Sequence, residues 1–309
     1  MIILGTLDFQ TLSDAVGLGA VYALMAVGIG LVFGVLRLVN FAYGQLVMAG
    51  AYTLAYTSSW PTWTSILTCV AVVVALSLAM DTVVFRPLRG ASPAVMLVTT
   101  FAIAFMLQAV ALIVDVRDGT IGQVAPSLSS LNEAVTIGGT DIRKITLVSI
   151  GVAAAALLLL VLLLTRTTIG LHTRAAASDF RTARLLGVRA NRVIAFSVLL
   201  SGLLAAVVAV MMTVQQPFVT PDFALQDTII VLVGVVVGGM DRLWTAALGG
   251  FAIGFATSAF AGWLPSTGSW PFTSGVYLDS AVFGLVILTL LLRPDGLFTR
   301  RKHRAVERV

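Results

Sequence analysis

Residues 38–80 read LVNFAYGQLVMAGAYTLAYTSSWPTWTSILTCVAVVVALSLAM and contain no charged side chain. A helix crosses about 30 Å of hydrocarbon with roughly 20 apolar residues, so this stretch of 43 residues is long enough for two crossings. The polar residues between Thr57 and Ser65 predict the turn that separates them. The stretch therefore indicates an integral membrane protein.

The rest of the chain has the same character. Of its 309 residues, 59% are hydrophobic and 11% are charged, whereas soluble domains carry roughly a quarter charged residues. We predict an all-α polytopic protein with one transmembrane domain over residues 1–309. Its nine expected spans lie near 13–36, 41–57, 62–84, 94–114, 146–165, 192–213, 226–239, 245–262 and 277–293. The seventh is too short for a straight crossing, which indicates a broken or re-entrant helix.

The basic residues predict the orientation. With the N-terminus outside and the C-terminus cytoplasmic, only Arg117, Arg143 and Lys144 lie outside, in an extracytoplasmic loop over 115–145. The other sixteen of the 19 Lys and Arg residues fall on the cytoplasmic side, chiefly in the loop 166–192 and the tail 294–309. The net charge of +5 is thus an orientation signal and predicts no nucleic-acid partner. No basic region precedes the first apolar run, so no cleaved signal peptide is expected.

The sequence contains no recognisable catalytic motif. The two lysines, Lys144 and Lys302, follow arginines and belong to no phosphate-binding Gly-Lys-Ser/Thr loop, and no Gly-x-Ser-x-Gly pattern occurs. One cysteine, Cys69, and two histidines, His172 and His303, cannot assemble a disulfide or a Cys/His metal site. We therefore expect no catalytic residues, no metal and no cofactor.

Small residues recur inside the expected spans. Gly-x-x-x-Gly patterns occur at Gly30/Gly34, Gly234/Gly238 and Gly250/Gly254. Glycines at this spacing let helix backbones approach closely. Close packing is the favoured role of these glycines, and a direct contact with a transported solute is the alternative.

The loop 166–192 contains a periodic segment. At about 3.6 residues per turn, Ala176, Phe180, Ala183 and Gly187 share one helical face, opposite Arg174, Arg181 and Arg184. This predicts one short amphipathic helix over 173–187 that ends at Gly187. Such a helix could lie on anionic headgroups, but its shallow alanine face favours a groove on another protein.

Four blocks of the chain carry a family resemblance. They are LRLVNFAYGQLVMAGAY (36–52), TRAAASDFRTARLLGV (173–188), GVVVGGMDRLWTAALGGFAIG (234–254) and LLRPDGLF (291–298). In this order they resemble permease subunits of the branched-chain amino-acid type of ABC importer, in the branch that begins with an NFAHGE-like motif. Tyr43 and Gln45 stand where that motif has His and Glu.

The resemblance implies a set of partners and a bacterial plasma-membrane location. The partners are a second related permease subunit, as a heterodimer or a homodimer, two ATP-binding subunits that bind ATP in place of this chain, and an extracytoplasmic solute-binding protein. In such importers a cytoplasmic helix docks on the ATPase. The matching residues here are Arg174, Ala175, Asp179, Ala183, Leu186 and Gly187.

A translocation path is expected near the first and third blocks. The candidate path residues are Asn40, Tyr43, Gln45, Gly234, Gly238 and Gly239. Asn40 is expected to cap the second span, and whether the first three residues line a path or close a cytoplasmic turn stays open. Asp241 and Arg242 form either a local ion pair or part of a gate.

The expected cargo is small and neutral or zwitterionic. Asp14, Asp81, Asp227 and Asp279 are all expected near span ends, so mid-span regions would offer only neutral groups such as Gln108 and Thr100. Branched-chain amino acids imported by alternating access are the leading interpretation. Urea or short amides, and a secondary transporter working without an ATPase, are the alternatives.

Overall fold

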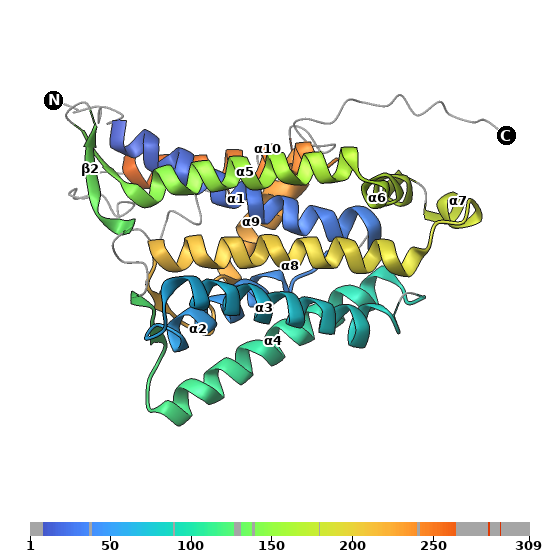
Figure 1. Cartoon of the computed structure of the whole chain (residues 1–309), viewed down its shortest axis with the longest axis horizontal. Helices are drawn as coiled ribbons and strands as arrows, with labels where there is room; N and C mark the ends of the chain where they lie inside the picture. The colour runs from blue at the N-terminus through green and yellow to red at the C-terminus, as the bar shows by residue number, and fades with distance from the viewer. Residues whose placement is uncertain are drawn as a thin grey trace.

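The structure of the chain is a computed structural model. It describes residues 9–36, 39–88, 90–126, 131–137, 140–178, 180–239 and 242–263, together with residues 284 and 291. The expected last span 277–293 and the tail 294–309 fall almost entirely outside these residues. Helices run side by side along the longest axis of the molecule, and short strands lie at one end (Figure 1).

Six helices are long and apolar enough to cross a membrane. Each corresponds to one of the expected spans within a few residues at most boundaries. Helix α3 (Thr62–Met80) continues without interruption into a π-helical turn, η1 (Asp81–Phe85). The six are α1 (Phe9–Leu36), α3 (Thr62–Met80), α4 (Pro93–Asp118), α5 (Lys144–Arg166), α8 (Ala190–Gln215) and α10 (Leu243–Trp263).

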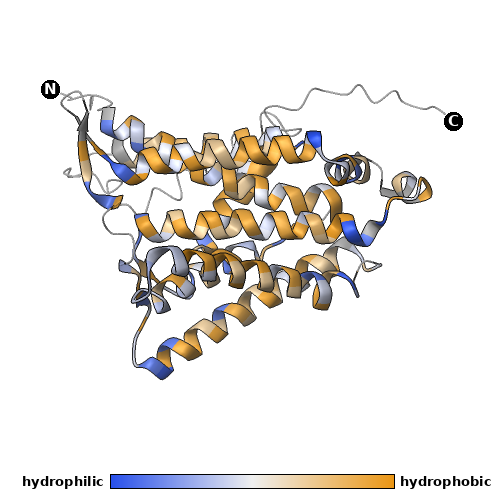
Figure 2. Cartoon of the chain, viewed as in Figure 1, coloured by the Kyte–Doolittle hydropathy of each residue, from blue (hydrophilic) through white to orange (hydrophobic). Residues whose placement is uncertain are grey.

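The centre of the bundle is α1, against which α8 and α10 pack. In its most apolar window 83% of α1 is buried inside the chain, against only 17% for α4. The exposed surface of α4 and α5 is strongly hydrophobic (Figure 2). Because apolar side chains facing outward are stable in lipid but not in water, this pattern is that of a membrane bundle.

Glycines set the contact between α1 and α10. A Cβ on Gly254 would lie 2.9 Å from the Cα of Gly19, and one on Gly250 would lie 2.6 Å from the carbonyl oxygen of Tyr22. The close packing expected of Gly250/Gly254 is therefore confirmed. At Gly34 a Cβ would meet nothing within 4 Å, so this glycine does not serve close packing within the chain.

Two apolar helices are shorter than a crossing. These are α2 (Tyr43–Tyr56) and α9 (Leu225–Gly238), each of 14 residues and so about 21 Å long. The expectation that 226–239 is short is confirmed. The expected second span 41–57 matches α2 in position, but at 14 residues α2 is shorter than a straight crossing.

The first turns of these two short helices meet inside the bundle. A Cβ on Gly44 of α2 would lie 2.7 Å from the carbonyl oxygen of Ala224, just before α9. From there α2 runs toward the end of α4, where the hydroxyl of Tyr56 donates to Asp118 at 2.8 Å. In the opposite direction, α9 runs toward the start of α10. Broken helices of this kind are typical of transporter cores.

One end of the bundle, here named the strand end, carries two antiparallel pairs of short strands. These are β1 (Gln123–Val124) with β4 (Phe218–Val219), and β2 (Ala134–Ile137) with β3 (Thr140–Arg143). The carboxylate of Asp14 in α1 pairs with Arg143 at 3.1 Å and accepts from Thr146 at 3.0 Å. Lys144 donates to Glu133 at 2.7 Å and thereby lowers the pKa of that exposed carboxyl.

The opposite end, here named the α7 end, carries α6 (Thr168–Ser178) and α7 (Phe180–Leu185). The single helix expected over 173–187 is therefore wrong in extent, because the helical segment starts at Thr168 and forms two helices. Gly187 has a φ of 86°, and the Val188 N–H donates to the Ala183 carbonyl at 3.1 Å. The predicted left-handed helix end at Gly187 is confirmed.

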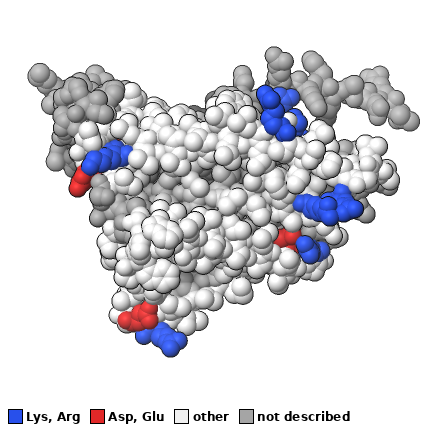
Figure 3. All heavy atoms as spheres, viewed as in Figure 1, with Lys and Arg blue, Asp and Glu red and all other residues white. Residues whose placement is uncertain are grey.

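Charged side chains gather at the two ends and leave the middle of the visible face white (Figure 3). Arg166 ends α5, Arg189 precedes α8 and Arg192 lies in its first turn, all at the α7 end. Arg117 and Arg143 lie at the strand end, beside α4 and α5. The described residues thus show the same separation of basic residues that the sequence analysis used for orientation.

Candidate functional site

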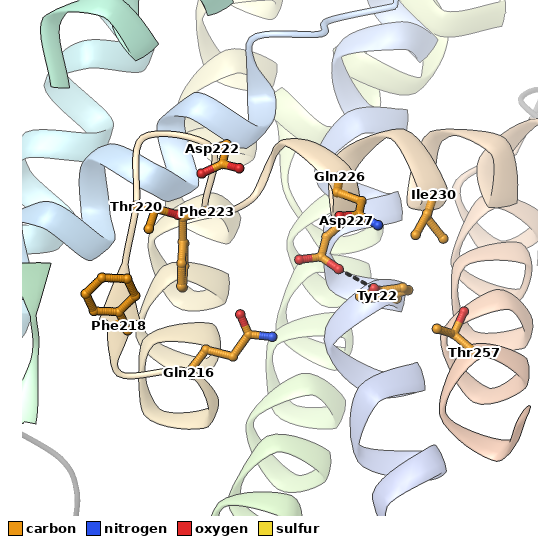
Figure 4. Close-up of a pocket in the computed structure, with 10 residues that line it drawn as sticks. All are labelled: Tyr22, Gln216, Phe218, Thr220, Asp222, Phe223, Gln226, Asp227, Ile230 and Thr257. Atoms are coloured by element: carbon orange, nitrogen blue, oxygen red, sulfur yellow. Dashed lines mark hydrogen bonds between the residues drawn. The ribbon is translucent and has the colours of Figure 1, made fainter. Parts of the chain in front are cut away.

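A cavity of about 430 Å³ lies between α1, α9, α10 and the segment that joins α8 to α9. We name it the mid-depth cavity. Figure 4 shows Gln216, Phe223 and Asp227 directed toward a common space. Ten residues line it, namely Tyr22, Gln216, Phe218, Thr220, Asp222, Phe223, Gln226, Asp227, Ile230 and Thr257.

The depth of the cavity follows from Tyr22 and Asp227. The Tyr22 hydroxyl donates a short hydrogen bond to Asp227 Oδ1. Tyr22 lies at the midpoint of α1, which runs from Phe9 to Leu36, and Asp227 lies in the first turn of α9. Asp227 thus lies at the start of its helix, as expected, but this helix start is inside the bundle and not near its surface. The chain folds back into the bundle before α9 begins, which places this carboxylate halfway along a membrane-spanning helix.

The connection from α8 to α9 builds one wall of the cavity. After Gln215 ends α8, β4 pairs with β1, and the Ala125 N–H donates to the Pro217 carbonyl at 2.8 Å. Two turns follow, closed by hydrogen bonds from Phe223 N to the Thr220 carbonyl and from Leu225 N to the Asp222 carbonyl. These turns bring both Asp222 and Phe223 to the cavity just ahead of α9.

The lining combines negative charge with apolar surface. Two carboxylates, two amide side chains and three hydroxyls share it with Phe218, Phe223 and Ile230, and no Lys or Arg is among the ten lining residues. The Tyr22 hydroxyl donates to one oxygen of the Asp227 carboxylate. The cavity can therefore accept a small molecule with a cationic or donor group at one end and an apolar group at the other.

A buried carboxylate holds the strand-end wall in place. Asp115 near the end of α4 accepts from the Tyr52 hydroxyl at 2.6 Å and from the Gly122 N–H at 3.1 Å. The Gln123 amide donates to the same carboxylate at 3.4 Å. This network ties α2 and α4 to β1, and β1 in turn pairs with β4 beside the cavity. Its role is structural, because each of its members bonds another part of the chain.

The candidate path residues of the first block lie elsewhere. Asn40 is buried, and its Oδ1 accepts from the Ala42 N–H at 3.1 Å, so it closes the turn before α2 and does not cap the first turn of the helix. Tyr43 and Gln45 are also buried, and the Tyr43 ring lies against Gly28 of α1. None of the three lines the mid-depth cavity.

The candidate path glycines serve the contact between α9 and α10. A Cβ on Gly234 would lie 3.1 Å from the Gly249 carbonyl oxygen, and one on Gly238 would lie 2.9 Å from the Gly249 Cα. Gly239 follows α9 with a φ of 102°. Close packing is thus the role the structure gives Gly234 and Gly238. The question of an Asp241–Arg242 pair falls outside the described residues, because Asp241 is not among them.

Neutral side chains named for the path are similarly placed outside the cavity. Thr100 is buried in α4, where its hydroxyl donates to the Leu97 carbonyl at 2.9 Å. Gln108 lies half-buried on the same helix. Neither side chain lines the mid-depth cavity.

The candidate ATPase-contacting residues lie at the α7 end. Ala176 and Ala183 are 3% and 4% exposed, so the alanine face packs against the chain itself and not against a groove of another protein. Arg174 is exposed and Ala175 is half-buried, whereas Asp179 lies outside the described residues. The exposed apolar residues at the tip are Leu185 and Leu186, at 83% and 80%, next to Gly187.

The sequence analysis missed the cavity residues Tyr22, Gln216 and Thr257 and discounted Asp227. One signal was present in the sequence. Asn40-Phe41-Ala42 precedes α2 and Asp222-Phe223-Ala224 precedes α9, so a similar short pattern marks the start of both short helices. If the second occurrence is interpreted as a helix start inside the bundle, Asp227 is predicted to lie away from the surface.

The chain is similar to permeases of known transport systems. A family model described as "Branched-chain amino acid transport system / permease component" matches residues 11–291. A high-affinity branched-chain amino acid transport system permease protein, BraD of Pseudomonas aeruginosa, is 29% identical over 94% of this chain and 95% of its own length. LivH of Salmonella typhimurium is 25% identical over the same shares. PsaBC from Streptococcus pneumoniae in complex with Fab aligns at 16% identity and a TM-score of 0.47, covering 93% of this chain and 94% of that one.

Proposed function

Because the chain belongs to the family of permease components of branched-chain amino acid transport systems, we propose that it imports amino acids with branched aliphatic side chains. The chain is the membrane permease subunit of an ABC importer. The observation that carries the substrate class is the family match over residues 11–291, supported by curated relatives that cover almost the whole chain. The partners would be two ATP-binding subunits, a second related permease and an extracytoplasmic solute-binding protein.

The orientation we propose places the strand end outside and the α7 end in the cytoplasm. Arg166, Arg174, Arg189 and Arg192 at the α7 end support it, since basic residues favour the cytoplasmic side. Single cysteines at Ile121 and at Arg189, in a Cys69→Ser background, would test it in intact cells with an impermeant thiol reagent. Position 121 should react and position 189 should not, and the reverse pattern would refute the orientation.

The ATPase contact we propose is the tip formed by Leu185, Leu186 and Gly187. Large apolar side chains this exposed are uncommon outside lipid unless a partner covers them, and they lie at the predicted cytoplasmic end. The buried alanines Ala176 and Ala183 would then hold the tip on the bundle and not contact the ATPase. Arg174, exposed on α6, is the basic residue of the loop that can flank this contact.

The ATPase contact can be tested by co-purification. The double variant Leu185→Asp/Leu186→Asp should retain roughly a tenth or less of the ATPase, because apolar anchors at an interface centre carry much of the affinity. Ile121→Asp, at an apolar position with the same exposed fraction as Leu185 (83%) but at the strand end, is the matched control and should retain it. Full ATPase retention by the double variant would exclude this tip as the contact.

The importer function itself is tested by uptake of radiolabelled L-leucine into cells. Uptake should require this chain, the ATP-binding subunits and the binding protein together. Uptake that persists without the ATP-binding subunits would support the alternative of a secondary transporter. Competition by urea or acetamide in preference to isoleucine and valine would support the short-amide alternative.

A further inference from the structure

We infer that the mid-depth cavity is a transport-path binding site for an aliphatic amino acid, with the substrate ammonium group at Asp227 and its side chain against Phe218 and Phe223. This inference rests on the proposed function and adds to it a site, a binding mode and a residue that recognises charge. The cavity residues come from three helices and one connection, so a ligand there would contact every element that surrounds the start of α9.

The first step of the argument is the position of Asp227. Tyr22, its hydrogen-bond donor, lies at the middle of α1, and 83% of the apolar window of α1 is buried inside the chain. A carboxylate at this depth costs several kcal/mol of solvation unless it has partners, and such residues usually mark substrate or ion pathways. Asp227 also opens onto a cavity, whereas the buried Asp115 is enclosed by its hydrogen bonds.

The second step is the charge of the lining. Asp222 and Asp227 are both acidic, and the described residues that line the cavity include no Lys or Arg. An ammonium group can donate to these carboxylates through charge-assisted hydrogen bonds, which are about twice as strong as neutral ones. Urea and short amides carry no cationic group and gain no such bond. The substrate carboxylate would receive a donor from the amide of Gln216, which lies on the opposite side of the cavity from Gln226 (Figure 4).

The third step is the apolar part of the lining. Phe218 and Phe223 come from the connection after α8, and Ile230 lies one turn beyond Asp227 on α9. Phe218 and Phe223 lie on one side of Asp227 and offer apolar surface to an aliphatic side chain, whereas Ile230 lies on the other side (Figure 4). The volume of about 430 Å³ falls within the range of small-molecule sites and suits a molecule of the size of leucine.

The test uses the complete importer, reconstituted in lipid vesicles with its partner permease, ATP-binding subunits and binding protein. A cysteine replaces Thr257, which lines the cavity, in a Cys69→Ser background, and its rate of modification by a small neutral thiol reagent is measured. L-Leucine should slow this modification at least threefold. 4-Methylpentanoate, which has the same carbon skeleton without the ammonium group, should not slow it. Equal protection by both molecules, or by neither, would overturn the inference.

A second measurement concerns Asp227 directly. Asp227→Asn should lower the initial rate of leucine uptake roughly 10- to 100-fold, because a charge-assisted hydrogen bond is lost. Asp118→Asn is the matched control, since Asp118 is also a carboxylate bonded by a tyrosine but lies at the strand end, outside the cavity. Wild-type uptake by Asp227→Asn would overturn the inference even if the importer function stands.

The two proposals fail in distinguishable ways. If the unmodified importer shows no ATPase-dependent leucine uptake, the proposed function is wrong. If it imports leucine but the protection experiment gives the same rates with and without leucine, only the binding site is wrong. The protection experiment needs no change at Asp227, so it remains decisive if Asp227→Asn does not fold.

Discussion

The starts of α2 and α9 are built alike and differ in what surrounds them. Each of these two short helices begins inside the bundle after an Asn-Phe-Ala or Asp-Phe-Ala sequence. Their starts touch where Gly44 of α2 approaches Ala224, the residue before α9. The start of α2 is closed, with Tyr43 and Gln45 fully buried among α1, α3 and α8. The start of α9 opens onto the mid-depth cavity. The start of α2 thus serves packing, and the start of α9 is available for a ligand.

The chemical difference between the two starts agrees with this division. Asn40 is neutral, and one backbone N–H at 3.1 Å satisfies its side-chain oxygen inside the protein. Asp222 is exposed and Asp227 is half-buried, and both line the mid-depth cavity. The tightly packed wall thus holds the neutral asparagine, whereas the two acidic side chains stay in contact with the cavity.

The largest effect is expected where the two starts touch. Gly44→Val should destabilise the protein by about 3 kcal/mol or more, because its Cβ would collide with Thr228 and lie 2.7 Å from the Ala224 carbonyl oxygen. The measurement is the thermal aggregation midpoint of the purified protein in detergent. Gly34→Val is the control, since a Cβ there meets nothing within 4 Å. An unchanged midpoint for Gly44→Val would contradict the contact between α2 and α9.

A smaller effect is expected where α9 leaves the cavity and packs on α10. Gly238→Ala should cost about 1–3 kcal/mol, because its methyl group would meet the Thr245 carbonyl and lie 2.9 Å from the Gly249 Cα. If Gly238 were a path residue and not a packing residue, uptake per folded molecule would fall while the thermal midpoint stayed the same. Measuring both quantities on one preparation separates the two roles.

A still smaller effect is expected at the turn before α2. Asn40→Ala should cost about 1 kcal/mol, because the Ala42 N–H loses its bond to Asn40 Oδ1 in a buried turn. Asn40→Asp keeps an acceptor and serves as the paired variant for this hydrogen bond. A thermal midpoint for Asn40→Ala equal to that of the wild type would mean that this turn does not depend on the side chain.

The smallest effect is expected at Tyr43. Its hydroxyl has no hydrogen-bond partner in the described part of the chain, and its ring packs against Gly28. Tyr43→Phe keeps the ring and should change stability by less than about 0.5 kcal/mol, with leucine uptake unchanged. Uptake reduced tenfold by Tyr43→Phe would instead make the start of α2 part of the transport path and would remove the contrast with α9.

The sequence predicted the parts of the fold that depend on composition along the chain. The six long helices match uncharged stretches, since an apolar helix is the structure that satisfies its own backbone in lipid. The left-handed residue at Gly187 was predicted because glycine adopts that conformation at little cost. The family was predicted from the four blocks, and the family match over residues 11–291 confirms the family.

Other features were decided by tertiary contacts that no window of sequence contains. Residues 41–57 are apolar enough for a span, yet the contact of Gly44 with the start of α9 fixes the beginning of α2 inside the bundle. The alanine face of 173–187 has the periodicity of a docking surface, but Ala176 and Ala183 are already covered by the rest of the chain. Amphipathic periodicity identifies a face that becomes buried and does not identify what buries it.

Asp227 separates most clearly what the sequence determines from what the tertiary structure decides. The sequence alone determined that the protein spans a membrane and that its basic residues gather at one end, because both follow from the cost of placing charge in hydrocarbon. By the same reasoning Asp227 belonged at a surface. Only the folding back of residues 216–224 toward α1 placed it at mid-depth, beside Tyr22, which precedes it by 205 positions. A hydrogen-bonding partner and a polar cavity offset the cost of burial, and both exist only once distant helices have packed together.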